Sequence, residues 1–169
     1  KGRVNAFRAV SAAVPPQVYN FPPTSISLYA GTYVSGDLSS ILASDNVRYQ
    51  INTSDANLGP VAGATITSQI TQPVGNLINL KLTIELNATG GATNMIWLYN
   101  WQTGEYDFWK AFPLSTGDKS VVVEISQFSK YISQTGEVSF ITRSNRPKRL
   151  PGGAFAYQID FVKLSGTFR

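Results

Sequence analysis

The stretch Leu77-Ile-Asn-Leu-Lys-Leu-Thr-Ile-Glu-Leu-Asn87 decides the fold class of this chain. Apolar side chains occupy every second position from Ile78 to Leu86, and polar or charged side chains fill the positions between them. Because side chains alternate between the two faces of a β-strand, this period of two predicts a strand with one buried and one solvated face. The stretch therefore predicts a sheet that covers a core on one side.

Shorter strand patterns lie on both sides of this stretch, at residues 25–30, 47–52, 61–71, 119–126, 137–143 and 155–167, with a single helical turn at 128–132. With the two strands of a hairpin in residues 95–112 they make about nine strands, separated by Gly, Asn, Asp and Pro. No long helical pattern interrupts them. The sequence therefore predicts an all-β, two-sheet antiparallel β-sandwich that is jelly-roll-like, with an immunoglobulin-type Greek key as the alternative.

The hairpin in residues 95–112 contains all three tryptophans of the chain, and seven of its eighteen residues are aromatic. Gln102-Thr-Gly104 is typical of a three-residue loop with glycine in the left-handed conformation. Closing that loop would pair Trp101 with Glu105 and Trp97 with Trp109, and paired residues share a face. One face is then core-like, with Ile96, Leu98, Asn100, Tyr106 and Phe108. The other is a contact surface for a ligand or a subunit, with Trp97, Tyr99, Trp101, Glu105, Asp107 and Trp109.

Residues 1–24 differ from the sandwich domain predicted for residues 25–169. The pairs Pro15-Pro16 and Pro22-Pro23 favour an extended, proline-containing N-terminal arm. The arm is too apolar for a solvated linker, so we expect it to pack on its own domain or on another molecule. Its candidate contact residues are Val4, Phe7, Val10, Val18, Tyr19 and Phe21.

The composition excludes several classes of function. Cysteine and histidine are both absent, so the chain lacks a thiol nucleophile, the commonest general base and the commonest metal ligand. Charged residues make up only 14% of the chain, and no apolar run is long enough for a membrane span. Low charge with many Ser, Thr and Asn residues is typical of secreted all-β proteins, so we expect an extracellular or cell-surface location.

The net charge of +4 is concentrated in one basic loop that contains Arg143, Arg146, Lys148 and Arg149. Aromatic residues do not interleave with these cations, which argues against nucleic-acid binding. We interpret the loop as a solvated surface, with an acidic polysaccharide or a neighbouring subunit as alternative partners.

The carboxylates do not indicate catalysis. A glycoside hydrolase needs two carboxyl groups that flank a cleft, and nothing marks such a pair among Glu85, Glu105, Asp107, Glu124 and Glu137. The chain is therefore predicted not to be an enzyme and to need no cofactor. Asp37, Asp45, Asn46 and Asp55 lie in predicted loops and leave a structural calcium open, although Asx residues in turns usually serve only to form the turn. Asn52 and Asn87 each begin an N-glycosylation acceptor triplet.

Five segments give the chain a resemblance to known proteins: Gly31-Thr-Tyr-Val-Ser-Gly-Asp-Leu-Ser39, Ala43-Ser-Asp-Asn46, Asn100-Trp-Gln-Thr-Gly-Glu-Tyr106, Thr135-Gly-Glu-Val138 and Tyr157-Gln-Ile-Asp-Phe-Val162. Together they resemble an uncharacterised β-sandwich module of secreted and cell-surface bacterial proteins over about residues 25–167. The resemblance implies a jelly-roll-like fold outside the cell without established catalysis. It also implies that Asn100, Trp101, Gly104 and Tyr106 are scaffold residues, whereas Trp97 and Trp109 are particular to this chain.

Two functions follow from these observations. The first is a self-assembling structural protein, a pilus-like or fibre subunit whose arm packs on, or adds a strand to, a neighbouring copy. The alternative is a carbohydrate-binding module that binds polysaccharide through an exposed aromatic hairpin face. We expect the arm to be ordered, which favours assembly, and we expect a folded monomer when residues 1–21 are deleted.

Overall fold

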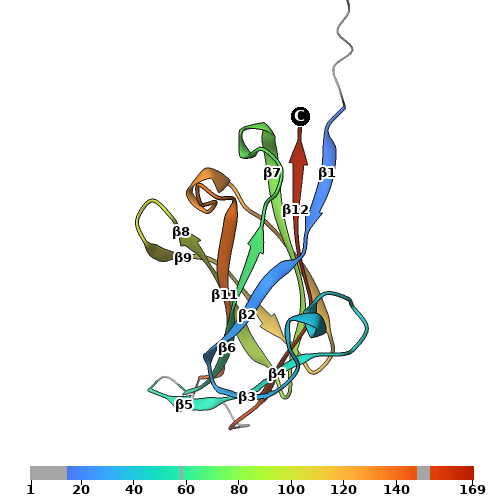
Figure 1. Cartoon of the computed structure of the whole chain (residues 1–169). Coiled ribbons are helices and arrows are strands. Elements are labelled where there is room, and N and C mark those ends of the chain that lie inside the picture. Colours follow the sequence, from blue (N-terminus) through green and yellow to red (C-terminus); the bar gives the residue numbers. More distant parts are fainter. Residues whose placement is uncertain (1–14, 58, 148–152) are drawn as a thin grey trace, which may run out of the picture.

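Two six-stranded sheets form a sandwich in the computed structural model, which describes residues 15–57, 59–147 and 153–169 (Figure 1). In the first sheet the strand order is β10-β7-β12-β4-β3, and β1 also pairs with β12. In the second sheet the order is β2-β6-β11-β8-β9, and β5 also pairs with β6. The strand pairs within the described residues are all antiparallel, which confirms the predicted two-sheet sandwich.

The strands of the first sheet are β1 (Gln17–Phe21), β3 (Thr32–Ser35), β4 (Tyr49–Asn52), β7 (Leu77–Ala88), β10 (Lys119–Glu124) and β12 (Ala156–Phe168). Those of the second are β2 (Pro23–Ala30), β5 (Ser54–Ala56), β6 (Gly59–Gln69), β8 (Ala92–Asn100), β9 (Glu105–Leu114) and β11 (Glu137–Asn145). The sequence pattern missed β1, β3 and β5. Each has five residues or fewer, too short for a period of two to stand out.

The strand that decided the fold class is β7, and it lies between β10 and β12. Leu80, Leu82, Ile84 and Leu86 are fully buried, as the alternation predicted. Ile78 is exposed instead, and Leu77 is buried in its place. The reason is a register shift between β7 and β12 at Thr167 and Phe168, which reverses the phase of the alternation at the start of the strand.

The described part of the predicted arm joins the chain's own sandwich. Residues Gln17–Phe21 pair antiparallel with the C-terminal strand, Phe168 to Leu164. Phe21 is buried there, and both Tyr19 and Phe21 make edge contacts with the ring of Phe168. Val18 is exposed. Residues 1–14, which include Val4, Phe7 and Val10, lie outside the described residues.

Helical structure in the described ranges consists of three 3-10 turns, η1 (Leu38–Ile41), η2 (Val74–Asn76) and η3 (Phe128–Lys130). The last of them confirms the turn predicted at residues 128–132. None of these turns approaches the length that a membrane-spanning helix requires.

The core contains one polar network between the sheets. Tyr157 of β12 donates its hydroxyl hydrogen to Asn94 Oδ1 of β8 at 3.0 Å, and it lies 2.6 Å from the hydroxyl of Thr142 on β11. All three side chains are fully buried, and burial raises the pKa of Tyr157. Because each polar group finds a partner inside the core, the network fixes how the two sheets pack.

We expect Tyr157→Phe to lower the free energy of unfolding by about 1–2 kcal/mol, because Asn94 and Thr142 lose a buried partner. Urea denaturation measures the change. Tyr33→Phe is the matched control, since the Tyr33 hydroxyl is exposed and donates to the Gly36 carbonyl at 2.7 Å. Equal stability losses in the two variants would contradict the role assigned to the network.

Candidate functional site

The register of the β8–β9 hairpin differs from the predicted one. Asn100 pairs with Glu105, Tyr99 with Tyr106, and Trp97 with Phe108. The loop therefore contains four residues, 101–104, rather than the predicted three. This shift by one residue moves the β9 side chains of residues 105–108 to the opposite face of the sheet.

The side chain of Asn100 explains the longer loop. Its Oδ1 accepts a hydrogen bond from the Gln102 N–H at 3.0 Å, and its backbone carbonyl accepts one from the Gly104 N–H at 2.8 Å. Gly104 has φ +76°, as expected for a left-handed position. An Asx turn thus begins the loop one residue earlier than the glycine alone indicated.

The new register brings five aromatic side chains to the outer side of the hairpin. We call them the aromatic face: Trp97, Tyr99, Trp101, Tyr106 and Phe108. Tyr106 and Phe108, which the sequence placed in the core, are exposed, and Phe108 is 58% exposed. Trp97 and Tyr99 lie on the outer side as predicted, and Trp101 is exposed in the loop.

The rings of the aromatic face support one another edge to face. The centroids of Tyr99 and Trp101 are 4.8 Å apart, those of Tyr99 and Tyr106 are 5.0 Å apart, and those of Trp97 and Phe108 are 5.9 Å apart. Such T-shaped pairs are favourable arrangements of aromatic quadrupoles and restrict the rotamers of each ring. The face is therefore held in place before any partner binds.

Arg143 of β11 extends the aromatic face towards β6. Its guanidinium carbon lies 5.2 Å from the Trp97 ring centroid, in a cation–π contact. Beyond Arg143 is a hollow of about 280 Å³, lined by Ala56, Asn57, Gly59, Val61, Arg143 and Asn145. Arg143 thus joins the aromatic face to this hollow, where Asn57 and Asn145 add polar side chains to the lining. The sequence predicted that Arg143 belongs to a solvated loop. It lies in β11 instead, and its guanidinium contacts the Trp97 ring.

Trp109 lies on the inner side of the hairpin, contrary to the predicted outward pairing with Trp97. It is the extra residue of a β-bulge, because Trp97 pairs with Phe108 and Ile96 pairs with Lys110. Its ring packs against the core at 5.3 Å from Tyr131, and its Nε1 donates to the Glu124 carbonyl at 3.1 Å.

Glu105 and Asp107 also lie on the inner side of the hairpin, because they pair with Asn100 and Leu98. The carboxylate of Asp107 accepts hydrogen bonds from Asn100 Nδ2 at 2.9 Å and from the Tyr131 hydroxyl at 3.1 Å. Burial, and then the bond to Asp107, raise the pKa of Tyr131. Asp107 is therefore engaged inside the chain and is not free to bind a ligand on the aromatic face.

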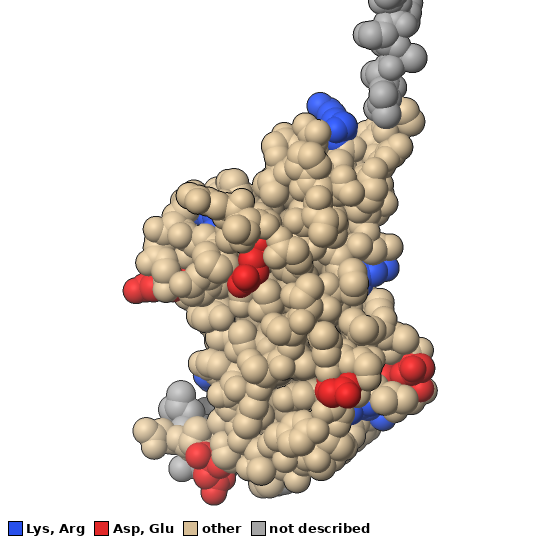
Figure 2. All heavy atoms as spheres, viewed as in Figure 1, with Lys and Arg blue, Asp and Glu red and all other residues tan. Residues whose placement is uncertain are grey.

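The predicted basic loop does not act as one solvated unit. Arg146 is only 3% exposed and donates hydrogen bonds to the carbonyls of Thr89, Gly91 and Gly153. Lys148 and Arg149 lie outside the described residues. Charged side chains are also sparse on the face of the molecule shown in Figure 2.

The predicted loop oxygens have local roles. Asp37 caps η1, since its Oδ1 accepts hydrogen bonds from the Ser39 hydroxyl and from the Ser39 N–H at 2.8 Å, and these two bonds lower its pKa. Asp45 accepts from the Val47 N–H, and Asp55 lies in β5. Asn87 of the second glycosylation triplet is buried, with its Nδ2 bonded to Asp118, whereas Asn52 is exposed.

Comparison of the structure with solved structures finds carbohydrate-binding modules. A mutant of a family 29 module aligns with a TM-score of 0.50 and 9% identity, over 89% of this chain and 92% of that chain. A second variant of such a module, complexed with mannohexaose, aligns with a TM-score of 0.48 and 9% identity over 91% and 93% of the two chains. The first likeness confirms the jelly-roll fold. No family model and no curated protein sequence matches the chain.

Proposed function

We propose that this chain is a non-catalytic carbohydrate-binding module whose binding surface is the aromatic face of the β8–β9 hairpin. The observation that carries the proposal is the exposure of large rings that the hairpin holds in fixed positions. Trp101, Tyr106 and Phe108 are all exposed, although such side chains are usually buried. Apolar patches of this kind mark a surface that binds something.

Sugar rings suit this surface chemically. The C–H groups on the flat side of a pyranose ring pack against the electron-rich face of an aromatic ring. The hydroxyl groups at the edge of the sugar need polar partners, which the Tyr99 and Tyr106 hydroxyls and the Arg143 guanidinium supply. These groups take the place of Glu105 and Asp107, which the sequence assigned to the contact surface. The fold of a carbohydrate-binding module adds support to this proposal.

Within the aromatic face, we assign the direct sugar contacts to Phe108 and Trp101. Trp97 already contacts Arg143 and the edge of Phe108, so its role is to support its neighbours. A polysaccharide chain that crosses these rings would continue over Arg143 towards the hollow beside Asn145. Because polysaccharides of this kind are found outside cells, we keep the expectation of an extracellular location.

Assembly through the arm has weaker support than the sequence suggested. Gln17–Phe21 add their strand to β12 of the same chain, so this part of the arm is not available for a neighbouring sheet. Deleting residues 1–21 would remove β1 and uncover Phe168, so we now expect such a deletion to destabilise the domain. The role of residues 1–14 in self-association stays a prediction.

The test is retention of the protein on polysaccharides, with insoluble cellulose and mannan in pull-downs and their soluble derivatives in affinity gels. We expect retention of the wild type on at least one of them, and at least tenfold weaker binding for Phe108→Ala and for Trp101→Ala, with unchanged melting temperatures. Tyr33→Ala is the matched control, because Tyr33 is an exposed aromatic residue of the other sheet.

Two results would contradict the proposal. One is a wild-type protein that none of these polysaccharides retains. The other is retention that both hairpin variants keep in full, which would place the binding surface elsewhere on the sandwich.

A further inference from the structure

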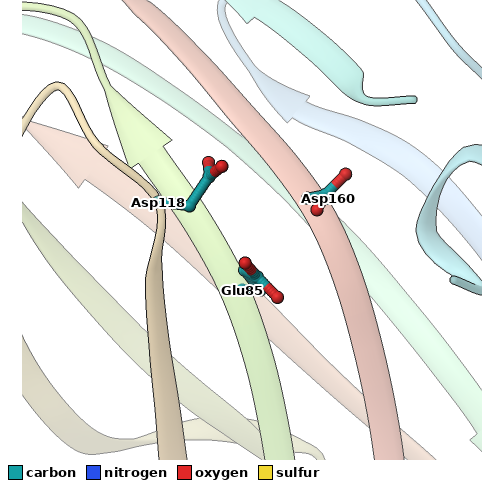
Figure 3. Close-up of side chains that lie close together, drawn as sticks. All are labelled: Glu85, Asp118 and Asp160. Carbon is teal, nitrogen blue, oxygen red and sulfur yellow. The ribbon is translucent and has the colours of Figure 1, made fainter. Parts of the chain in front are cut away.

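Three carboxylates converge on the outer side of the first sheet, away from the aromatic face. They are Glu85 of β7, Asp118 in the segment that precedes β10, and Asp160 of β12, and each contributes an oxygen within 4.8 Å of the others (Figure 3). None of them belongs to the calcium candidates of the sequence. They are separated by 33 and 42 residues along the chain, so only the fold brings them together.

Asp160 distinguishes this cluster from ordinary surface acids. Its side chain is only 2% exposed, and its Oδ1 is buried without a hydrogen-bond partner among the described residues. It lies at a β-bulge between Ile159 and Phe161, which turns the side chain out of the regular alternation. Bulges commonly redirect a side chain towards a site, and a buried carboxylate oxygen without a partner is costly.

The charges near the cluster do not balance. Arg48 forms an ion pair with Asp118 at 2.7 Å, and this is the only ion pair of the three carboxylates within the described ranges. One guanidinium thus faces three carboxylates. Burial raises the pKa of Asp160, although Arg48 opposes the shift, and Glu85 and Asp118 raise it further. A divalent cation would neutralise the two remaining negative charges.

The surrounding hydrogen bonds hold the carboxylates in place. Asn87 Nδ2 donates to Asp118 Oδ1 at 2.6 Å, and Ser44 Oγ donates to Glu85 Oε2 at 2.9 Å. The backbone of Asn46, a residue with φ +66°, lies beside Asp160 and opposes the rise in the pKa of that carboxyl. The loop of residues 44–46 therefore lies beside two of the three acids.

We propose that Glu85, Asp118 and Asp160 form a structural binding site for Ca²⁺. Calcium prefers carboxylate oxygens at about 2.4 Å, so two oxygens on one ion lie at most about 4.8 Å apart, as the cluster allows. Water completes the usual six to eight ligands. The ion joins β7, β12 and the start of β10, and it is independent of polysaccharide binding.

The test compares melting temperatures of chelator-treated protein in EDTA and in millimolar CaCl₂, at equal ionic strength set with NaCl. We expect CaCl₂ to raise the melting temperature of the wild type by roughly 5 °C. Asp160→Asn should not respond, and in EDTA it should melt no lower than the wild type, because it removes a repelled buried charge. Asp55→Asn, an acid of β5 outside the cluster, should respond like the wild type.

Isothermal titration with CaCl₂ provides a second readout, with heat from one site in the wild type and none in Asp160→Asn. If Asp160→Asn does not fold, Glu85→Gln replaces it, since Glu85 is partly exposed. A wild type with neither a thermal shift nor a binding heat overturns the proposal and leaves Arg48 as the sole counter-ion. A full response in Asp160→Asn overturns it as well.

Discussion

Arg146→Ala is expected to lower the free energy of unfolding by about 3–5 kcal/mol, although Arg146 belongs to a run of basic residues that looks like surface. Its Nε and Nη2 donate to the carbonyls of Gly91 and Thr89, each at 2.8 Å, and its Nη1 donates to the Gly153 carbonyl at 3.1 Å. The guanidinium also lies 5.0 Å from the Phe155 ring centroid. The substitution would leave three carbonyls without this partner.

The size of this effect follows from where those carbonyls lie. Thr89 and Gly91 form the turn between β7 and β8, and Gly153 precedes β12. Because β7 and β12 belong to one sheet and β8 and β11 to the other, Arg146 joins both sheets at one end of the sandwich. Thermal and urea unfolding measure the loss.

Arg146→Lys should recover only a small part of this stability, because an ammonium group cannot reproduce the planar fork that serves three acceptors. Lys110→Ala, at an exposed cation of β9, is the control and should change stability by less than about 0.5 kcal/mol. A value for Arg146→Ala within the range of this control would show that the three carbonyls are satisfied by water.

Sequence patterns predicted those features that depend on neighbouring residues. Alternation alone predicted the buried face of β7, because Leu80 to Leu86 obey a period of two over seven residues. The same alternation is present at β10, where Val123 is buried and Val121 packs against the core. It also predicted the sandwich, since many short strands without helices have few other ways to bury their apolar faces.

The sequence did not predict what depends on a single side chain or on long-range contacts. Asn100 shifts the hairpin loop by one residue, and this reverses which side of the sheet Phe108 and Asp107 occupy. Arg146 is indistinguishable from its basic neighbours until the turn at Thr89 is placed beside it. Asp160 sits inside an alternating strand, and only the bulge and the approach of Glu85 make it unusual.

Trp109→Ala is expected to lower the free energy of unfolding by about 2–4 kcal/mol and to leave polysaccharide retention unchanged below the melting transition. β9 is the edge strand of the second sheet, and β10 is the edge strand of the first. Trp109 connects these two edges, since its ring contacts Tyr131 and its Nε1 donates to the carbonyl of Glu124 in β10. Removing the indole therefore opens one side of the sandwich.

Urea denaturation and the retention assay, applied to the same proteins, separate Trp109 from the aromatic face. Phe108→Ala is the matched comparison, because Phe108 is the adjacent residue and projects to the opposite side. It should keep its stability and lose retention, whereas Trp109→Ala should do the reverse. Trp109→Phe should regain part of the packing on Tyr131 without the bond to Glu124, and so fall between wild type and Trp109→Ala in stability. If Trp109→Ala instead kept its melting temperature and lost retention, Trp109 would face the ligand and the register of the hairpin would be wrong.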